Sequence, residues 1–336
     1  MLAGLLLTGC VGGIDGAEGP ARNPEEAGYD DDTIDGASDV PAPATRVPRI
    51  THEQWENTVQ DLLGLDEPTG LSAGLRADAK GGSIFGNEGG QLVVDDSLWG
   101  GYQRAAADVA ELVMNDATIV DRILPAGADL DARAQAFVTT FGLRAYRRPL
   151  TADEVSAHVA LFKSAATLIP DRDAETAGVG LLIELFLQSP HFLYRFEPSS
   201  EASGEKIPLG PYEVASRLSY MLWNTMPDDE LFAAAAKGDL NRADVAGEQA
   251  RRMLADPRAE ETVTRFHRML YQVNTYDAMH PNATVFPDVT DKLPEYAAQE
   301  HELFVKGLVF DDNAGFEALL TSNRTFVNAE LAGIYG

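Results

Sequence analysis

The chain has 336 residues, 45% hydrophobic and 24% charged, a composition typical of a globular protein of roughly two domains. Its formal net charge of −27 repels phosphate groups, which argues against nucleic acid or an anionic membrane surface as a partner. A single cysteine excludes an internal disulfide and any metal or iron–sulfur site built from several cysteines.

The first ten residues form a short apolar stretch that ends in Leu7-Thr8-Gly9-Cys10. This ending resembles the bacterial lipoprotein signal, in which small residues precede a cysteine, and the resemblance implies cleavage before Cys10 and attachment of lipid to it. Several acyl chains on one residue give stable membrane anchoring. Because a signal peptide normally begins with basic residues and none stands here, we expect the true start of the protein to lie upstream of Met1.

Residues 11–48 are rich in glycine, proline and acidic side chains. Between Asp15 and Asp39 there are nine acidic residues and one basic residue, Arg22. With almost no apolar periodicity, such a segment does not bury enough surface to offset the entropy of ordering it. We therefore predict a disordered acidic tether that follows the lipid signal of residues 1–10 and places the folded part in the cell envelope, outside the cytoplasm.

From Thr51 onward the pattern is helical. Thr51 and Gln54 form a capping box ahead of apolar residues at helical spacing, and Gly64 ends that helix. Thr151 and Glu154 form a second capping box. The periodicity predicts further helices at residues 97–115, 130–145, 173–189, 291–310 and 315–335.

The second half of the chain carries equally clear helix starts. Gly210-Pro211 places proline at a first helical position, and the acids at residues 228–230 suit the first turn of another helix. Asn241 and Asp256 are predicted to cap two more. Only residues 191–197 are interpreted as a short extended piece. The predicted fold class is all-α, a multi-helix bundle in two packed helical subdomains with little or no sheet.

The folded part begins with ITHEQWENTVQDLLGLD, continues with FVTTFGLRAYRRPLTADEVSAHVALF and LLIELFLQSPHFLYRFE, and ends with LGPYEVASRLSYMLWNTMPDDELFAAAAKGDL, ARRMLADPRA and RTFVNAELAGIYG. In this order the segments resemble domains of unknown function 1587, 1595 and 1592 of large secreted bacterial proteins. The resemblance implies helical domains at residues 49–128, 129–197 and 209–336, and further domains beyond Gly336. It also implies a location outside the cytoplasm, and partners such as a c-type cytochrome or a polysaccharide.

Two segments carry groups that suit ligand binding. Residues 189–197 contain His191 and Arg195, which bind a carboxylate or take part in proton transfer; the alternative is a hinge in which Arg195 pairs with an acid. Arg147-Arg148 is interpreted as a structural clamp, because guanidinium groups bind carboxylates in a planar fork.

A second candidate ligand site lies on the helix that begins at Pro211. Tyr220 and Trp223, near Arg217, have rings that stack on sugars. The alternative is that both rings belong to the core, as aromatic residues at helical spacing usually do.

Glu300 is the candidate catalytic acid or base. The helix predicted at residues 291–310 places it four residues after Tyr296 and four before Phe304, in an apolar seam. A buried acid there needs a partner or has a raised pKa, and the candidate partners are Arg265, Arg268 and His267. The alternative is a structural ion pair.

The sequence contains no Cys-x-x-Cys-His, no His-Glu-x-x-His and no Gly-x-Ser-x-Gly. Haem attachment, a zinc site on one helix and an esterase-type serine are therefore not supported, and we predict no metal and no cofactor. The leading hypothesis is a lipid-anchored binding or assembly component of a cell-surface complex. The alternatives are an enzyme that uses Glu300, His267 and His191 in one cleft, and a docking module for a basic c-type cytochrome.

Overall fold

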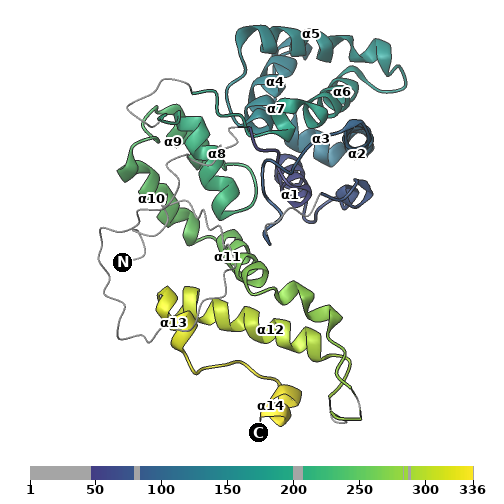
Figure 1. Cartoon of the computed structure of the whole chain (residues 1–336). Coiled ribbons are helices and arrows are strands. Elements are labelled where there is room, and N and C mark those ends of the chain that lie inside the picture. Colours follow the sequence, from purple (N-terminus) through teal and green to yellow (C-terminus); the bar gives the residue numbers. More distant parts are fainter. Residues whose placement is uncertain (1–46, 79–83, 200–206, 283, 287–288, 336) are drawn as a thin grey trace. The chain divides into compact units, whose positions relative to one another are not determined.

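The computed structural model describes residues 47–78, 84–199, 207–282, 284–286 and 289–335 (Figure 1). Cys10, the signal around it and residues 11–46 of the predicted tether lie outside these residues. The described chain has no strand, and its only ladder-type contact is an isolated antiparallel bridge between Arg49 and Tyr194. None of the described helices combines the length and hydropathy needed to cross a membrane. The predicted all-α fold is confirmed.

The first group of helices encloses the larger hydrophobic core (Figure 1). Helix α6 packs against α2, α4 and α5, and Phe137, Phe162 and Phe186 are fully buried between them. The group consists of α1 (His52–Leu63), α2 (Asp96–Met114), α3 (Ala117–Ile123), α4 (Leu130–Tyr146), α5 (Ala152–Leu168), α6 (Ala174–Gln188) and the single turn α7 (Pro190–Leu193), with a 3₁₀ turn η3 (Leu71–Gly74).

Helices α5 and α6 approach closely because a glycine lies where their surfaces meet. A Cβ atom on Gly178 of α6 would lie 2.5 Å from the ring of Phe162 on α5. The absence of a side chain at this position lets the phenylalanine ring pack against the backbone of the neighbouring helix.

The second group begins with α8 (Pro211–Leu222), which takes part in both cores. Tyr220 belongs to the larger core, whereas Leu222 and Trp223 belong to a smaller one. The group continues with α9 (Asp229–Ala236), α10 (Ala243–Leu254), α11 (Pro257–Leu270), η4 (Val273–Ala278), α12 (Leu293–Lys306), the π-helical turn η5 (Gly307–Asp311), α13 (Phe316–Thr321) and α14 (Ala329–Tyr335).

Most predicted helix ends are present. Both capping boxes form, at Thr51 with Gln54 and at Thr151 with Glu154. Gly64 ends α1 in the left-handed conformation with φ 65°, which a glycine adopts without strain. Asp256 caps α11 through a bond from the backbone N–H of Arg258.

Three sequence-based expectations were wrong. The helix expected at residues 315–335 is two helices, because Asn328 accepts bonds from Glu330 and Leu331 and starts α14 anew. Asn241 does not cap α10, whose N-cap residue is Arg242, one position later. Residues 190–193 form a helical turn capped by Ser189, so the extended piece begins only at Tyr194.

Candidate functional site

A pocket of about 250 Å³ lies where the end of α4, the segment after α7 and the start of α8 meet. Its lining includes three arginines, Arg147, Arg148 and Arg195, together with His191 and one acidic residue, Glu213. This is a cationic lining in a chain whose formal net charge is −27. We refer to it as the arginine pocket.

Arg147 connects the end of α4 to the segment around α7, and both line the arginine pocket. It ends α4 in the left-handed conformation, with φ 56°, and the residue is only 3% exposed. Its Nη2 lies 2.9 Å from each of the carbonyl oxygens of His191, Phe192 and Tyr194. These bonds from Nη2 hold the turn α7, and within the described chain no carboxylate neutralises the positive charge of Arg147.

Arg148 is paired. It donates to both carboxylate oxygens of Glu154, at 2.8 and 2.9 Å, as the predicted clamp requires. These bonds, together with the backbone N–H of Thr151, lower the pKa of Glu154 to about 2. The charge of Arg148 is therefore neutralised within the protein.

Arg195 is the available cation of the arginine pocket. Its Nε atom is buried and makes no hydrogen bond among the described residues. Across the described chain, no carboxylate oxygen lies within 4.0 Å of the guanidinium nitrogens of Arg147 or Arg195. Burial lowers the pKa of Arg195, which reflects a charge removed from water without a matched anion. The pairing of Arg195 with an acid, considered as the structural alternative, is absent here.

The acids near Arg195 are already engaged. Glu197 accepts two bonds from Arg217, at 2.5 and 2.7 Å. Glu213, at the start of α8, accepts bonds from the backbone N–H of Ser199 and of Gly210 and from the Ser199 hydroxyl. Both carboxylates therefore serve structural bonds, and Glu197 only partly opposes the lowering of the Arg195 pKa by burial.

Two uncharged groups in the arginine pocket are also without partners. Nδ1 of His191 and Oγ of Ser216 are buried and make no hydrogen bond within the described chain. Burial and the nearby positive charge of Arg148 lower the pKa of His191, so its ring is neutral at pH 7. The side chain of His191 is 42% exposed, and the pocket is therefore reached from solvent.

The predicted acid Glu300 lies elsewhere, in a second pocket of about 570 Å³ that His301 also lines. Its carboxylate accepts bonds from the hydroxyl groups of Thr325 and of Tyr335, the latter at 2.7 Å. The expected partners Arg265 and Arg268 pair instead with Glu53 and Glu302.

The geometry of α12 explains why the expected partners of Glu300 were wrong. Glu300 and Glu302 are two residues apart and therefore project from nearly opposite sides of the helix. Only Glu302 meets Arg268 of α11. His267 is buried on α11, where its Nδ1 bonds the carbonyl oxygen of Val263 at 2.8 Å.

The candidates proposed for catalysis are therefore not brought together. His191 and Arg195 share the arginine pocket, Glu300 lines another pocket, and His267 lines neither. Among the described residues, no three His, Cys, Asp or Glu side chains are grouped so as to hold a metal ion.

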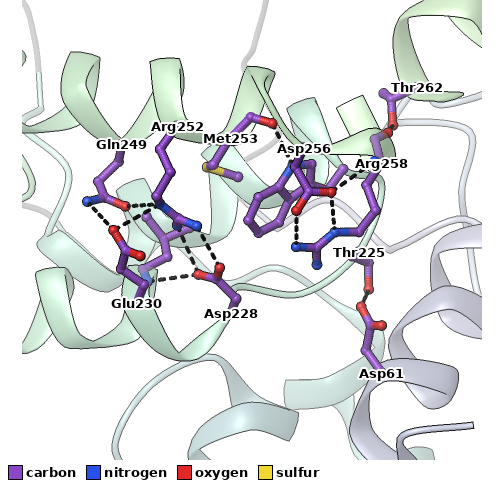
Figure 2. A network of polar contacts seen from close by, with 12 residues as sticks. Asp61, Thr225, Asp228, Glu230, Gln249, Arg252, Met253, Asp256, Arg258 and Thr262 are labelled. Carbon is purple, nitrogen blue, oxygen red and sulfur yellow. Dashed lines mark hydrogen bonds and ion pairs between the residues drawn. The ribbon is translucent and has the colours of Figure 1, made fainter. Parts of the chain in front are cut away.

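Tyr220 and Trp223 are core residues, 4% and 3% exposed. The guanidinium carbon of Arg258 lies 3.6 Å from the centroid of the Trp223 ring, and the ring nitrogen donates to the carbonyl oxygen of Met253. Figure 2 shows the surrounding network, in which Asp256 binds Arg258. Neither ring offers an open face to a sugar, as the core alternative requires.

Sequence reasoning missed Ser216 and treated Arg147 as structural only. Ser216 gives no sequence signal, because a serine on a helix is usually solvated or bonded to its own backbone. The sequence shows both arginines, but only the fold shows that Arg148 pairs with an acid and that Arg147 has no acidic partner in the described part of the chain.

Three family models match the chain: PSD3, a protein of unknown function (DUF1587), at residues 48–115; PSD5, a protein of unknown function (DUF1595), at residues 133–197; and PSD4, a protein of unknown function (DUF1592), at residues 209–336. The chain carries the PSD3, PSD5 and PSD4 domains. The recognition of these families from sequence is confirmed. No curated protein and no solved structure matches the chain.

The family matches locate the arginine pocket. Arg147, Arg148, His191 and Arg195 lie in the PSD5 domain, and Ser216 lies in the PSD4 domain. The pocket thus lies at the junction of two domains, a preferred location for ligand sites.

Proposed function

We propose that this chain is a lipid-anchored binding protein outside the cytoplasm and that it binds an anionic group in the arginine pocket. The observation that carries the proposal is the charge of Arg195, which has an unpartnered buried Nε and no carboxylate oxygen within 4.0 Å in the described chain. Arg147 adds a second unneutralised guanidinium to the same lining.

A bound anion would offset the cost of these buried charges. Removing an ion from water costs several kcal/mol unless a partner restores the lost interactions. Bonds between guanidinium groups and anionic oxygens are roughly twice as strong as bonds between neutral groups. Because Arg148 is already matched by Glu154, the positive charge left for a ligand comes from Arg147 and Arg195 and is reduced by the carboxylate of Glu213 in the same lining.

Binding of sulfate, phosphate and citrate, measured by calorimetry at constant ionic strength with the full chain, tests the anion site. We expect Arg195→Gln to weaken binding about 10- to 100-fold, the range for a lost charge-assisted bond. Arg242→Gln removes the same charge from an exposed pair with Asp244 and should leave binding unchanged. Equal affinity of the two variants, or no binding of any anion, would refute the proposal.

The proposed anchoring depends on Cys10 and on the acidic residues that follow it. Metabolic labelling with palmitate should mark the wild-type protein and not Cys10→Ala. Undiminished labelling of Cys10→Ala would contradict the anchoring.

A further inference from the structure

We infer that the ligand of the arginine pocket is a carboxylated sugar, the uronate residue of an acidic polysaccharide. The inference rests on the anion site proposed above and adds the chemical class of the ligand. Three properties of the pocket carry it: one available guanidinium fork, two neutral hydrogen-bonding groups, and aromatic side chains in the lining.

The guanidinium fork suits a planar anion. The Nε of Arg195 makes no hydrogen bond among the described residues, and the central carbon of its guanidinium lies over the ring of Tyr220, 5.4 Å from the ring centroid. A carboxylate matches the edge of a guanidinium with two parallel hydrogen bonds. Beside the paired Arg148, the lining carries the positive charges of Arg147 and Arg195 and the negative charge of Glu213. A ligand with charge −1 balances the remaining positive charge, whereas a divalent phosphate or sulfate adds a negative charge that the lining does not match.

The neutral groups suit hydroxyls. Oγ of Ser216 and Nδ1 of His191 are buried in the lining without partners. A serine hydroxyl both donates and accepts, and a neutral imidazole nitrogen does one or the other. Sugar hydroxyls likewise donate and accept, so a uronate satisfies both groups as well as Arg195. A simple carboxylate such as acetate would leave them unsatisfied.

The aromatic part of the lining suits the apolar face of a sugar ring. Phe196 is 39% exposed, its ring centroid lies 5.0 Å from that of His191, and Tyr212 also lines the pocket. Aromatic rings combine apolar area with rigid geometry. The volume of about 250 Å³ is below the roughly 300–1,000 Å³ of pockets for drug-sized ligands, so it fits one sugar unit.

Calorimetry with the full chain tests the inference, using methyl β-D-glucuronide, methyl β-D-glucoside, sodium acetate and inorganic phosphate at one ionic strength. We expect the glucuronide to bind most tightly and Arg195→Gln to weaken it about 10- to 100-fold. Ser216→Ala should weaken the glucuronide about 2- to 10-fold and leave acetate unchanged, because only the sugar has hydroxyls to lose. Circular dichroism and thermal unfolding establish that each variant is folded.

The remaining outcomes separate the two proposals. If phosphate binds more tightly than the glucuronide and loses affinity in Arg195→Gln, the sugar inference is overturned and the anion site stands. Equal binding of acetate and glucuronide, or equal binding of glucoside and glucuronide, also overturns the sugar inference. If no anion binds, both proposals fall.

Discussion

The guanidinium of Arg195 lies over the ring of Tyr220, with its central carbon 5.4 Å from the ring centroid, and Arg147 contacts the same ring at 5.6 Å. The hydroxyl of Tyr220 also accepts a bond from Arg147 at 3.3 Å and lies 2.9 Å from Oγ1 of Thr58. Tyr220 thus connects α8 to α1 and to the end of α4, and it holds two like charges on one ring.

Tyr220→Phe should therefore destabilise the protein by about 1–2 kcal/mol. The substitution keeps the ring beneath both guanidinium groups and removes a buried hydroxyl with two polar neighbours. Tyr220→Leu should lower the free energy of unfolding further, because it also removes the cation–π contacts with Arg147 and Arg195. Urea unfolding followed by circular dichroism measures both. An unchanged midpoint for Tyr220→Phe would show that the hydroxyl contacts do not stabilise the fold.

Glu154 should contribute stability that depends on pH. Bonds from Arg148 lower its folded-state pKa to about 2, from an ordinary value of 4.5. A depressed carboxyl pKa gives stability that is present above pH 4.5 and is lost as the pH falls towards 2. Glu154→Gln keeps a side chain that can complete the capping box with Thr151 but removes the charge.

We expect Glu154→Gln to lower the free energy of unfolding by about 1 kcal/mol at pH 7, the upper range for a partly exposed ion pair. The difference from wild type should shrink steadily between pH 4.5 and pH 2. Urea unfolding at a series of pH values measures this. If the difference in the free energy of unfolding stays constant over that range, the bidentate contact with Arg148 is not the source of the pH-dependent stability.

His301 should make the fold less stable in mild acid. Burial lowers its pKa, the positive potential of His267 lowers it further, and Glu302 opposes both while Arg268 adds to them. Since the folded state binds a proton less readily than the unfolded state, stability is present above pH 6.5 and is lost as the pH falls below that value.

Replacing His301 by Gln should make the decline of thermal stability between pH 7 and pH 5 shallower. His280 is exposed, and His280→Gln is the matched control that should leave the decline unchanged. The ring proton signals of His301, followed by NMR, should titrate below pH 6.5. Titration above that value would contradict the expected burial of the ring.

Gly178→Ala should destabilise the contact between α5 and α6 by about 1–3 kcal/mol, because the added methyl group would overlap the ring of Phe162. Gly247→Ala, in α10, is the control: its Cβ would meet nothing closer than Arg251 at 3.9 Å. We expect Gly247→Ala to raise the free energy of unfolding by about 0.5–1 kcal/mol, because alanine has a higher helix propensity than glycine. Equal and small effects at both positions would show that α5 and α6 can move apart freely.

Local signals predicted the helices well where the residues that mark an end are close in sequence. Capping depends on contacts between residues two or three positions apart, as at Thr51 with Gln54 and Thr151 with Glu154. The prediction was wrong at residues 315–335, where apolar residues continue and the start of α14 depends on the single residue Asn328. The start of α10 was also predicted at the wrong residue, because its N-cap residue Arg242 makes no side-chain capping bond that a sequence pattern could reveal.

The candidate site could be predicted only in part from the sequence. His191 and Arg195 were recognised because they are neighbours with suitable chemistry, and they do share a pocket. The partners of Glu300 were wrong, because the choice between Glu300 and Glu302 depends on the rotation of α12 against α11. A helical pattern determines which residues share a face, and it does not determine which neighbour that face meets.

By itself the sequence determined the all-α class, the positions of most helix ends and the three family domains, because each depends on local pattern or on motifs along the chain. Only the tertiary structure decided which arginines lack an acid among the residues it describes. Glu154 reaches Arg148 and Glu197 reaches Arg217, while Arg147 and Arg195 meet carbonyl oxygens and an aromatic ring. Charge pairing acts over a few ångströms, so it depends on how the side chains pack: Arg148 and Glu154 are six residues apart, whereas Arg147 meets carbonyl oxygens 44 to 47 residues further along the chain.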